Sequence, residues 1–80
     1  PYPNPFNPST TIKFSLDFSQ DIDLKVYGVN GNFVETLIKG RLTKGQHSIR
    51  WNASNHPSGV YFIQIKSWNV LETQKVVLIK

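Results

Sequence analysis

Apolar and polar side chains alternate along most of the chain, and this alternation predicts β-strands. Over residues 11–18, every second position carries a large apolar side chain, and Lys13, Ser15 and Asp17 stand between them. Residues 22–26 repeat the pattern. A period of two places one face of a strand on a core and the other in solvent. No segment has the i, i+3, i+4, i+7 spacing of an amphipathic helix, so we expect no helix.

A hairpin is predicted where the dipeptide Asn30-Gly31 separates two extended runs. Asn-Gly is typical of a type I′ turn, in which both central residues have positive φ. We therefore expect Asn30 and Gly31 to be structural turn residues and residues 32–39 to form the return strand. Because that strand carries apolar side chains on both faces, we expect it to lie between two neighbouring strands or beneath a loop.

Three more extended segments follow, at residues 46–52, 59–66 and 71–80. The connections between them hold glycine, proline and polar residues, including a loop at residues 53–58. Six or seven short strands at about ten-residue spacing predict an all-β fold. We expect an Ig-like antiparallel β-sandwich over residues 11–80.

The first ten residues differ from the rest because they contain four of the five prolines. Proline fixes φ, removes a hydrogen-bond donor and biases the residue before it toward extended conformations. We expect residues 1–10 to form a rigid, extended linker whose Tyr2 and Phe6 dock on the edge of the sandwich. The predicted organisation is therefore this proline-rich arm followed by one domain.

Length and composition exclude several classes of protein. Eighty residues make at most one domain, which leaves no room for a catalytic cleft between two lobes. The absence of cysteine excludes a disulfide framework and a thiolate zinc site. Because the chain also lacks methionine, we expect it to be part of a longer protein. The apolar run at residues 76–79 is far shorter than the roughly 20 residues of a membrane-spanning helix, so we expect no membrane insertion.

The formal charge of +4 does not by itself indicate a nucleic-acid partner. The lysine and arginine residues are spread along the chain, and their only local cluster is Lys39, Arg41 and Lys44 beside a turn. Nucleic-acid binding needs several cations on one face, and RNA readers usually interleave them with aromatic side chains. We therefore predict no nucleic-acid partner.

Residues able to support catalysis are few. His47 shares a strand face with Ile49 and Trp51, which favours a packed histidine. His56 lies in a polar loop with no carboxylate beside it in the sequence. Nucleophilic catalysis needs a nucleophile, a base and an orienting group within hydrogen-bond reach. We therefore expect neither an enzyme nor a cofactor.

Two ligand hypotheses stay open at this point. Asp17, Asp21 and Asp23 flank one turn, and carboxylate oxygens are the ligands that calcium prefers. Their spacing does not match an EF-hand, so a solvated turn is the favoured interpretation. Trp68, at a predicted turn, offers a flat ring on which a sugar could stack.

Several segments together resemble a known family. The opening YPNPFNPSTTI, at residues 2–12, is similar to the start of the type A C-terminal sorting domains of the type IX (Por) secretion system of Bacteroidetes. These domains are related to the Ig-like domain of the flagellar hook-capping protein. Further blocks of the family are resembled, in order, by residues 24–31 followed by Phe33-Val34, residues 45–51, residues 58–62 and residues 75–80. One departure is that Trp51 is followed by Asn52-Ala53, where the family often has Asp-Gly and a longer loop.

This resemblance implies a non-enzymatic C-terminal signal that directs an attached cargo protein across the bacterial outer membrane. The implied partners are the N-terminally attached cargo, an outer-membrane translocon and a sortase-like peptidase at the cell surface. The implied route leads through the periplasm to the cell surface or the extracellular space. The candidate recognition residues are Gly59, Val60, Tyr61, Lys75, Val76, Val77, Leu78, Ile79 and Lys80.

The closing segment has two interpretations that do not exclude each other. Residues 73–80 could present a free strand edge to a partner by β-augmentation, or residues 76–79 could simply close the core. The rival function is a structural Ig-like accessory module of a secreted enzyme, which binds carbohydrate or associates with itself. In that case two copies could form a homodimer by pairing exposed strand edges.

Overall fold

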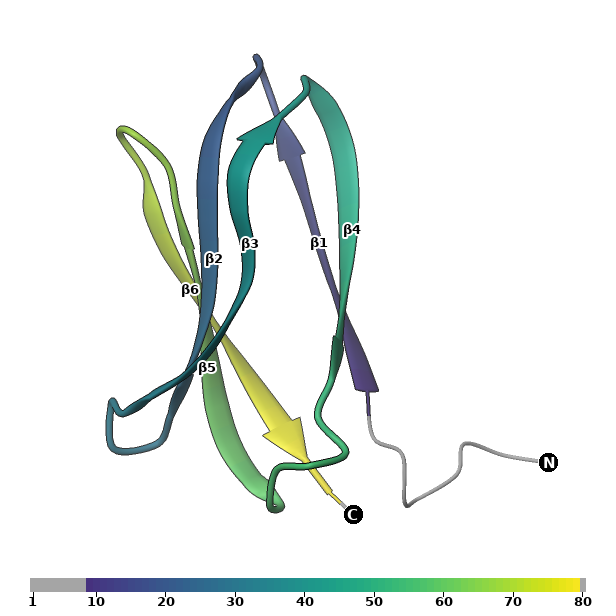
Figure 1. The fold of residues 1–80 in the computed structure, drawn as a ribbon, viewed down its shortest axis with the longest axis vertical. Helices are drawn as coiled ribbons and strands as arrows, with labels where there is room; N and C mark the ends of the chain where they lie inside the picture. Colours follow the sequence, from purple (N-terminus) through teal and green to yellow (C-terminus); the bar gives the residue numbers. More distant parts are fainter. Residues whose placement is uncertain (1–8, 80) are drawn as a thin grey trace, which may run out of the picture.

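The computed structural model describes residues 9–79, which form six β-strands. The strands are β1 (Ser9–Leu16), β2 (Gln20–Gly28), β3 (Phe33–Leu42), β4 (Gly45–Asn52), β5 (Gly59–Lys66) and β6 (Leu71–Leu78). They form two antiparallel sheets that face each other (Figure 1). The predicted all-β sandwich is confirmed, and no helix occurs among the described residues. The proposed docking of Tyr2 and Phe6 lies outside those residues.

Pairing between distant segments decides which strands lie at the edges. One sheet contains β1 and β4 alone, and the other has the order β3-β2-β5-β6. The edges of the larger sheet are therefore β3 and β6. Strand β1 begins and β6 ends at the same end of the molecule, the lower end in Figure 1. The β2–β3 turn and the β4–β5 loop lie there too, and we call this the C-terminal end of the sandwich.

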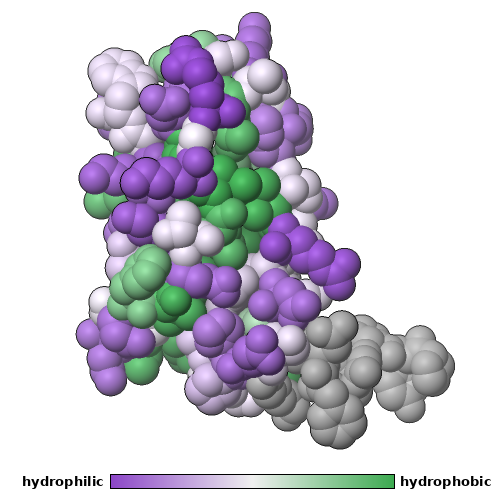
Figure 2. Space-filling view, in the orientation of Figure 1, coloured by the Kyte–Doolittle hydropathy of each residue, from purple (hydrophilic) through white to green (hydrophobic). Residues whose placement is uncertain are grey.

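The core lies between the two sheets and follows the period-two pattern. Its buried cluster consists of Ile12, Leu24, Val26, Trp51, Ala53, Tyr61, Ile63, Val76 and Leu78. Burial of one large apolar side chain contributes about 1.5–3 kcal/mol, so the alternating strands have a strong reason to face inward. Figure 2 shows apolar side chains in the space between the sheets, framed by hydrophilic side chains.

The return strand of the hairpin corrects one expectation. Strand β3 pairs with β2 alone, so it lies at an edge and not between two strands. Two register shifts against β2 leave Val34 and Leu37 without a Cα partner. Each extra residue shifts the alternation by one position, as β-bulges do. The bulges thus allow Val34, Leu37 and Ile38 all to pack against the core, which explains the apolar residues on both apparent faces.

The turn between β2 and β3 has the predicted residues in a different geometry. Gly31 has a φ of 82°, whereas no described non-glycine residue, Asn30 included, has a positive φ. The type I′ prediction is therefore wrong. The Gly31 N–H donates to the Gly28 carbonyl at 2.9 Å, and the Gly28 N–H donates to the Asn32 carbonyl at 2.8 Å. A turn followed by a left-handed glycine is the usual form of a three-residue hairpin loop, which has one residue more than the predicted turn.

Several strand boundaries also differ from the prediction. Strand β1 begins at Ser9, inside the segment expected to be a linker, because Ser9 and Thr10 pair with Asn52 and Trp51 of β4. Strand β1 ends at Leu16, and Phe18 lies in the following turn with 48% of its surface exposed. Strand β3 continues to Leu42, which pairs with Gln20 at the start of β2. The connection between β3 and β4 is consequently only Thr43 and Lys44, because pairing with β2 extends β3 through Gly40.

Candidate recognition surface on the C-terminal edge strand

The two parts of the predicted recognition set lie side by side. In the antiparallel pairing of β5 with β6, Gly59 is opposite Leu78, Val60 is opposite Val77, and Tyr61 is opposite Val76. Segments 14 or more residues apart thus form one paired strip at the C-terminal end of the sandwich. Lys80 lies outside the described residues.

Burial divides these residues into two groups. Tyr61, Val76 and Leu78 belong to the core cluster, where no partner protein can reach them without unfolding the sandwich. Val77 and Ile79 are 56% and 80% exposed. The exposed group, which also includes Lys75, is the part that can contact another molecule. Val76 and Leu78 therefore close the core, while the side chains that alternate with them stay accessible.

Tyr61 has a structural task in addition to its place in the core. Its hydroxyl donates a 2.6 Å hydrogen bond to the Pro57 carbonyl, and its ring meets Trp51 edge to face with centroids 5.2 Å apart. These contacts hold the β4–β5 loop against the start of β5. Tyr61 therefore positions the start of β5 and is not part of the exposed surface of the paired strip.

The outer edge of β6 has no pairing strand among residues 9–79. An antiparallel edge strand directs alternate N–H and C=O groups away from its neighbour, and an extended peptide can bind them. The register of β6 against β5 runs from Leu71 to Leu78 without a shift. This edge is therefore regular along its whole length, which suits β-augmentation.

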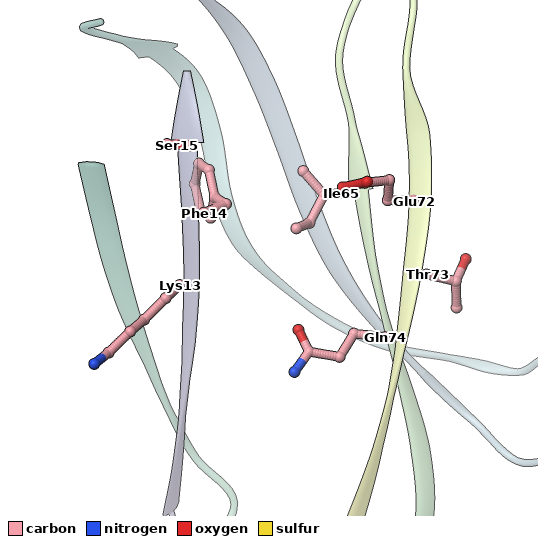
Figure 3. Close-up of a pocket in the computed structure, with 7 residues that line it drawn as sticks. All are labelled: Lys13, Phe14, Ser15, Ile65, Glu72, Thr73 and Gln74. Atoms are coloured by element: carbon pink, nitrogen blue, oxygen red, sulfur yellow. The ribbon is translucent and has the colours of Figure 1, made fainter. Parts of the chain in front are cut away.

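A groove separates the first half of β6 from the free edge of β1. Lys13, Phe14 and Ser15 of β1, Ile65 of β5, and Glu72, Thr73 and Gln74 of β6 line it. Figure 3 shows Phe14, Ile65 and the polar side chains of Glu72 and Gln74 directed into the space, with Thr73 directed away. Glu72 and Gln74 share the inward direction with Val76 and Leu78 but are exposed, because the smaller sheet does not cover them. The sequence pattern alone does not reveal this groove, since nothing local places β1 beside β6.

The polar side chains nearest the core connect a loop to strand β3. Glu35 Oε2 of β3 accepts a 3.2 Å hydrogen bond from Trp51 Nε1 and lies 3.4 Å from His56 Nε2. The contact attaches the β4–β5 loop to the β3 edge. His47 is half-buried as expected, stacks on Phe14 at 5.5 Å between ring centroids, and hydrogen-bonds the Thr43 carbonyl at 2.7 Å.

These observations agree with a family model that matches the chain. The model is described as a secretion system C-terminal sorting domain, and it matches residues 1–80, the full length of the chain. The chain belongs to this family. No curated protein and no solved structure matches it. The sorting domain serves type IX secretion: it follows an attached cargo protein, interacts with the type IX machinery, and leads to the cell surface or the extracellular space.

The calcium hypothesis and the sugar hypothesis concern two different places in the sorting domain. Asp23 lies 3.2 Å from Lys25 and Asp21 lies 3.8 Å from Arg41, so both face cations of their own sheet. Within residues 9–79, no three metal-ligating acidic, histidine or cysteine side chains come together. Trp68 is 74% exposed beside a shallow depression that Asp21 also lines. The described residues include no helix long and apolar enough to cross a membrane.

Proposed function

We propose that the type IX machinery recognises this sorting domain through the exposed side chains and the free edge of the second half of β6. The proposal rests on the difference between the two faces of β6: the side chains of one face are buried in the core, and those of the other face are exposed. Val76 and Leu78 hold the strand in the core, while Lys75, Val77 and Ile79 stay accessible. We call Lys75, Val77 and Ile79, with the free edge of β6 beside them, the recognition strip. An outer-membrane translocon that binds this strip therefore binds a folded domain.

The remaining candidate residues act by positioning this strip. Gly59 and Val60 pair with the end of β6, and Tyr61 secures the loop before them. Lys80 extends the same segment beyond Ile79. We also propose that the function is non-enzymatic, which the membership of the chain in a family of sorting signals supports.

The proline-rich segment that precedes β1 links the cargo to the sandwich in this proposal. Its sequence favours an extended conformation, which suits cleavage by a sortase-like peptidase at the cell surface. The described part of the chain begins at the same end of the molecule at which β6 ends. Cargo and recognition strip therefore approach the machinery from one side.

A reporter protein fused to residues 1–80 tests the proposal in a bacterium that has the type IX system. The fusion is expected outside the cell, and the double variant Val77→Lys/Ile79→Lys is expected to lower its secretion at least about tenfold. Leu71→Lys is the matched control, because Leu71 lies on the same strand, is 60% exposed and is outside the strip. Secretion of the double variant at the level of the control would contradict the proposed strip.

Self-association through the same edge is the competing use of β6. Two copies that paired their β6 strands would bury the edge and hide Val77. Sedimentation of the fusion protein distinguishes the two uses. A monomer at micromolar concentration supports an edge kept free for the machinery, whereas a stable dimer that Val77→Lys dissociates supports the homodimer.

A further inference from the structure

The outward face of the four-stranded sheet carries a row of aromatic side chains at the C-terminal end of the sandwich. Tyr27 of β2 is paired with Phe33 of β3 on one side and with Phe62 of β5 on the other. Phe62 is in turn opposite Lys75 of β6. Directly opposed residues in antiparallel strands point to the same face, so the row crosses all four strands.

This row faces away from the core. Val26 and Ile63, the chain neighbours of Tyr27 and Phe62, are fully buried, and alternation directs the aromatic rings to the opposite side. The rings of Tyr27 and Phe33 meet edge to face with centroids 6.0 Å apart. No strand of residues 9–79 covers this side, because the β1–β4 sheet packs on the other face.

Aliphatic side chains extend the row toward the chain end. Val60 and Val77 form the next cross-strand pair, and Val29 of the hairpin borders a depression that Tyr27 and Phe62 also line. Phe33, Val29 and Val77 are 57%, 65% and 56% exposed. We call these six residues, Tyr27, Val29, Phe33, Val60, Phe62 and Val77, the apolar outer patch.

The row that adjoins the patch on the same face is polar, although the exposed Leu71 lies farther along β6. The adjoining row consists of Thr36, Lys25, Gln64 and Thr73. The outer face of the sheet is thus hydrophilic directly beside the apolar outer patch. Tyr27, Val60 and Phe62 are half-buried, so the patch has a partly exposed aromatic centre with exposed apolar residues around it, and such a patch on a small domain indicates a surface that another molecule covers.

Charges at the border of the patch define the chemistry of that molecule. Lys25 and Lys75 stand at the border, and no carboxylate occupies either the aromatic row or the adjoining polar row. The nearest acidic side chain along β2, Asp23, is engaged by Lys25 at 3.2 Å. Because that ion pair also occupies Lys25, Lys75 is the cation that faces a partner at this border, and the complementary surface is apolar in its centre with a carboxylate at its rim beside Lys75.

We propose that the apolar outer patch is a second contact surface for a protein component of the export machinery, which presents such an apolar surface with an acidic rim. The inference rests on the proposed function, because Val77 belongs both to the patch and to the recognition strip. Through this shared residue the contact continues from the end of β6 onto the sheet face. The machinery then binds a folded surface to which β2, β3 and β5 contribute in addition to β6.

The reporter fusion also tests this inference, with substitutions that leave the recognition strip intact. Tyr27→Thr/Phe33→Thr is expected to lower secretion about tenfold, since threonine suits a strand but removes both rings. Trp68→Thr is the matched control, because it removes an exposed aromatic ring at the β5–β6 connection, outside the patch. Phe33→Thr alone, at a position 57% exposed, keeps the test valid if the double variant fails to fold. Thermal unfolding of each purified fusion checks the fold.

The rim chemistry is tested at one position with opposite charges. A carboxylate-bearing partner predicts that Phe33→Glu lowers secretion several-fold more than Phe33→Lys. The reverse order would overturn the acidic rim. Binding of the wild-type fusion to phosphatidylglycerol vesicles, lost in Tyr27→Thr/Phe33→Thr, would assign the patch to lipid and overturn the protein partner.

Different experimental results would refute this inference and the proposed function. If the wild-type fusion is secreted, Val77→Lys/Ile79→Lys is not, and the folded patch variants are secreted like Trp68→Thr, the second surface is refuted and the recognition strip stands. If the wild-type fusion itself stays inside the cell, the proposed function is refuted and the inference falls with it.

Discussion

The two edge strands of the larger sheet, β3 and β6, differ in how well their free edges are protected against pairing with another strand. Strand β3 is irregular: two bulges interrupt its pairing with β2, and Glu35 is tethered to Trp51 and the loop residue His56. Strand β6 is regular along its whole pairing with β5 and has no tether of this kind in the described contacts. Bulges and covering loops blunt an edge against unwanted pairing. The comparison indicates that β3 is a closed edge and β6 an open one, as a recognition strand requires.

The largest expected effect is loss of the tryptophan that anchors the closed edge. Trp51 is 1% exposed and packs against Tyr61 while its indole donates to Glu35. Trp51→Ala should lower the free energy of unfolding by about 3–5 kcal/mol through the cavity it leaves. Urea denaturation of the 80-residue chain measures this change. A loss below about 1 kcal/mol would show that the core does not depend on this anchor.

The inner face of the open edge should respond less, but still strongly. Leu78 is 4% exposed and lies in the core cluster at the end of β6. Leu78→Ala should lower the free energy of unfolding by about 2–4 kcal/mol. Hydrogen exchange should locate the loss of protection in β5 and β6. Uniform loss across both sheets would instead show that the β6 edge does not open independently.

Removal of the Glu35 carboxylate on β3 measures how much its hydrogen bond with Trp51 contributes to stability, apart from the packing of the Trp51 ring. Glu35→Ala leaves the Trp51 indole N–H without its acceptor, which costs about 1–2 kcal/mol for a partly buried donor. Glu35→Gln is the control, because its amide oxygen can still accept that hydrogen bond. Equal destabilisation by both variants, measured by thermal unfolding, would mean that the negative charge matters more than the acceptor.

The smallest expected effect on stability is on the outer face of β6. Val77 is 56% exposed, so Val77→Lys should change the free energy of unfolding by no more than about 0.5 kcal/mol. Its effect should appear in secretion of the reporter fusion instead. A destabilisation as large as that of Leu78→Ala would remove the distinction between an anchored and an open face of the strand.

Particular residues show how far the sequence pattern reaches. The alternation of Ile22, Leu24 and Val26 correctly predicts a strand with these three side chains inside. The same reasoning fails for β3, because a bulge changes the face of every later residue and leaves no local signal. It also predicts the wrong turn at Asn30-Gly31, where the loop takes one more residue than the dipeptide suggests.

The candidate recognition residues stay a prediction, and the sequence alone does not show which of them share a surface. Their sequence blocks resemble the family, and the family model matches the whole chain. Which of them face outward follows only from the sheet: Tyr61 is bound to Pro57 and Trp51, whereas Val77 is open. Likewise, Tyr27, Phe33 and Phe62 look like ordinary strand residues until pairing aligns them in one row.

The sequence by itself determined that this is a small all-β domain with alternating faces and no cysteine, because composition and a period of two are local properties of the chain. Only the tertiary structure decided that Gly59 lies opposite Leu78, that β6 rather than β3 is the open edge, and that an aromatic row crosses the outer face. The physical reason is that strand order and register depend on hydrogen bonds and packing between segments far apart in the chain. Alternation within one strand fixes which side chains share a face, but it carries no information about the neighbour to which that face is joined.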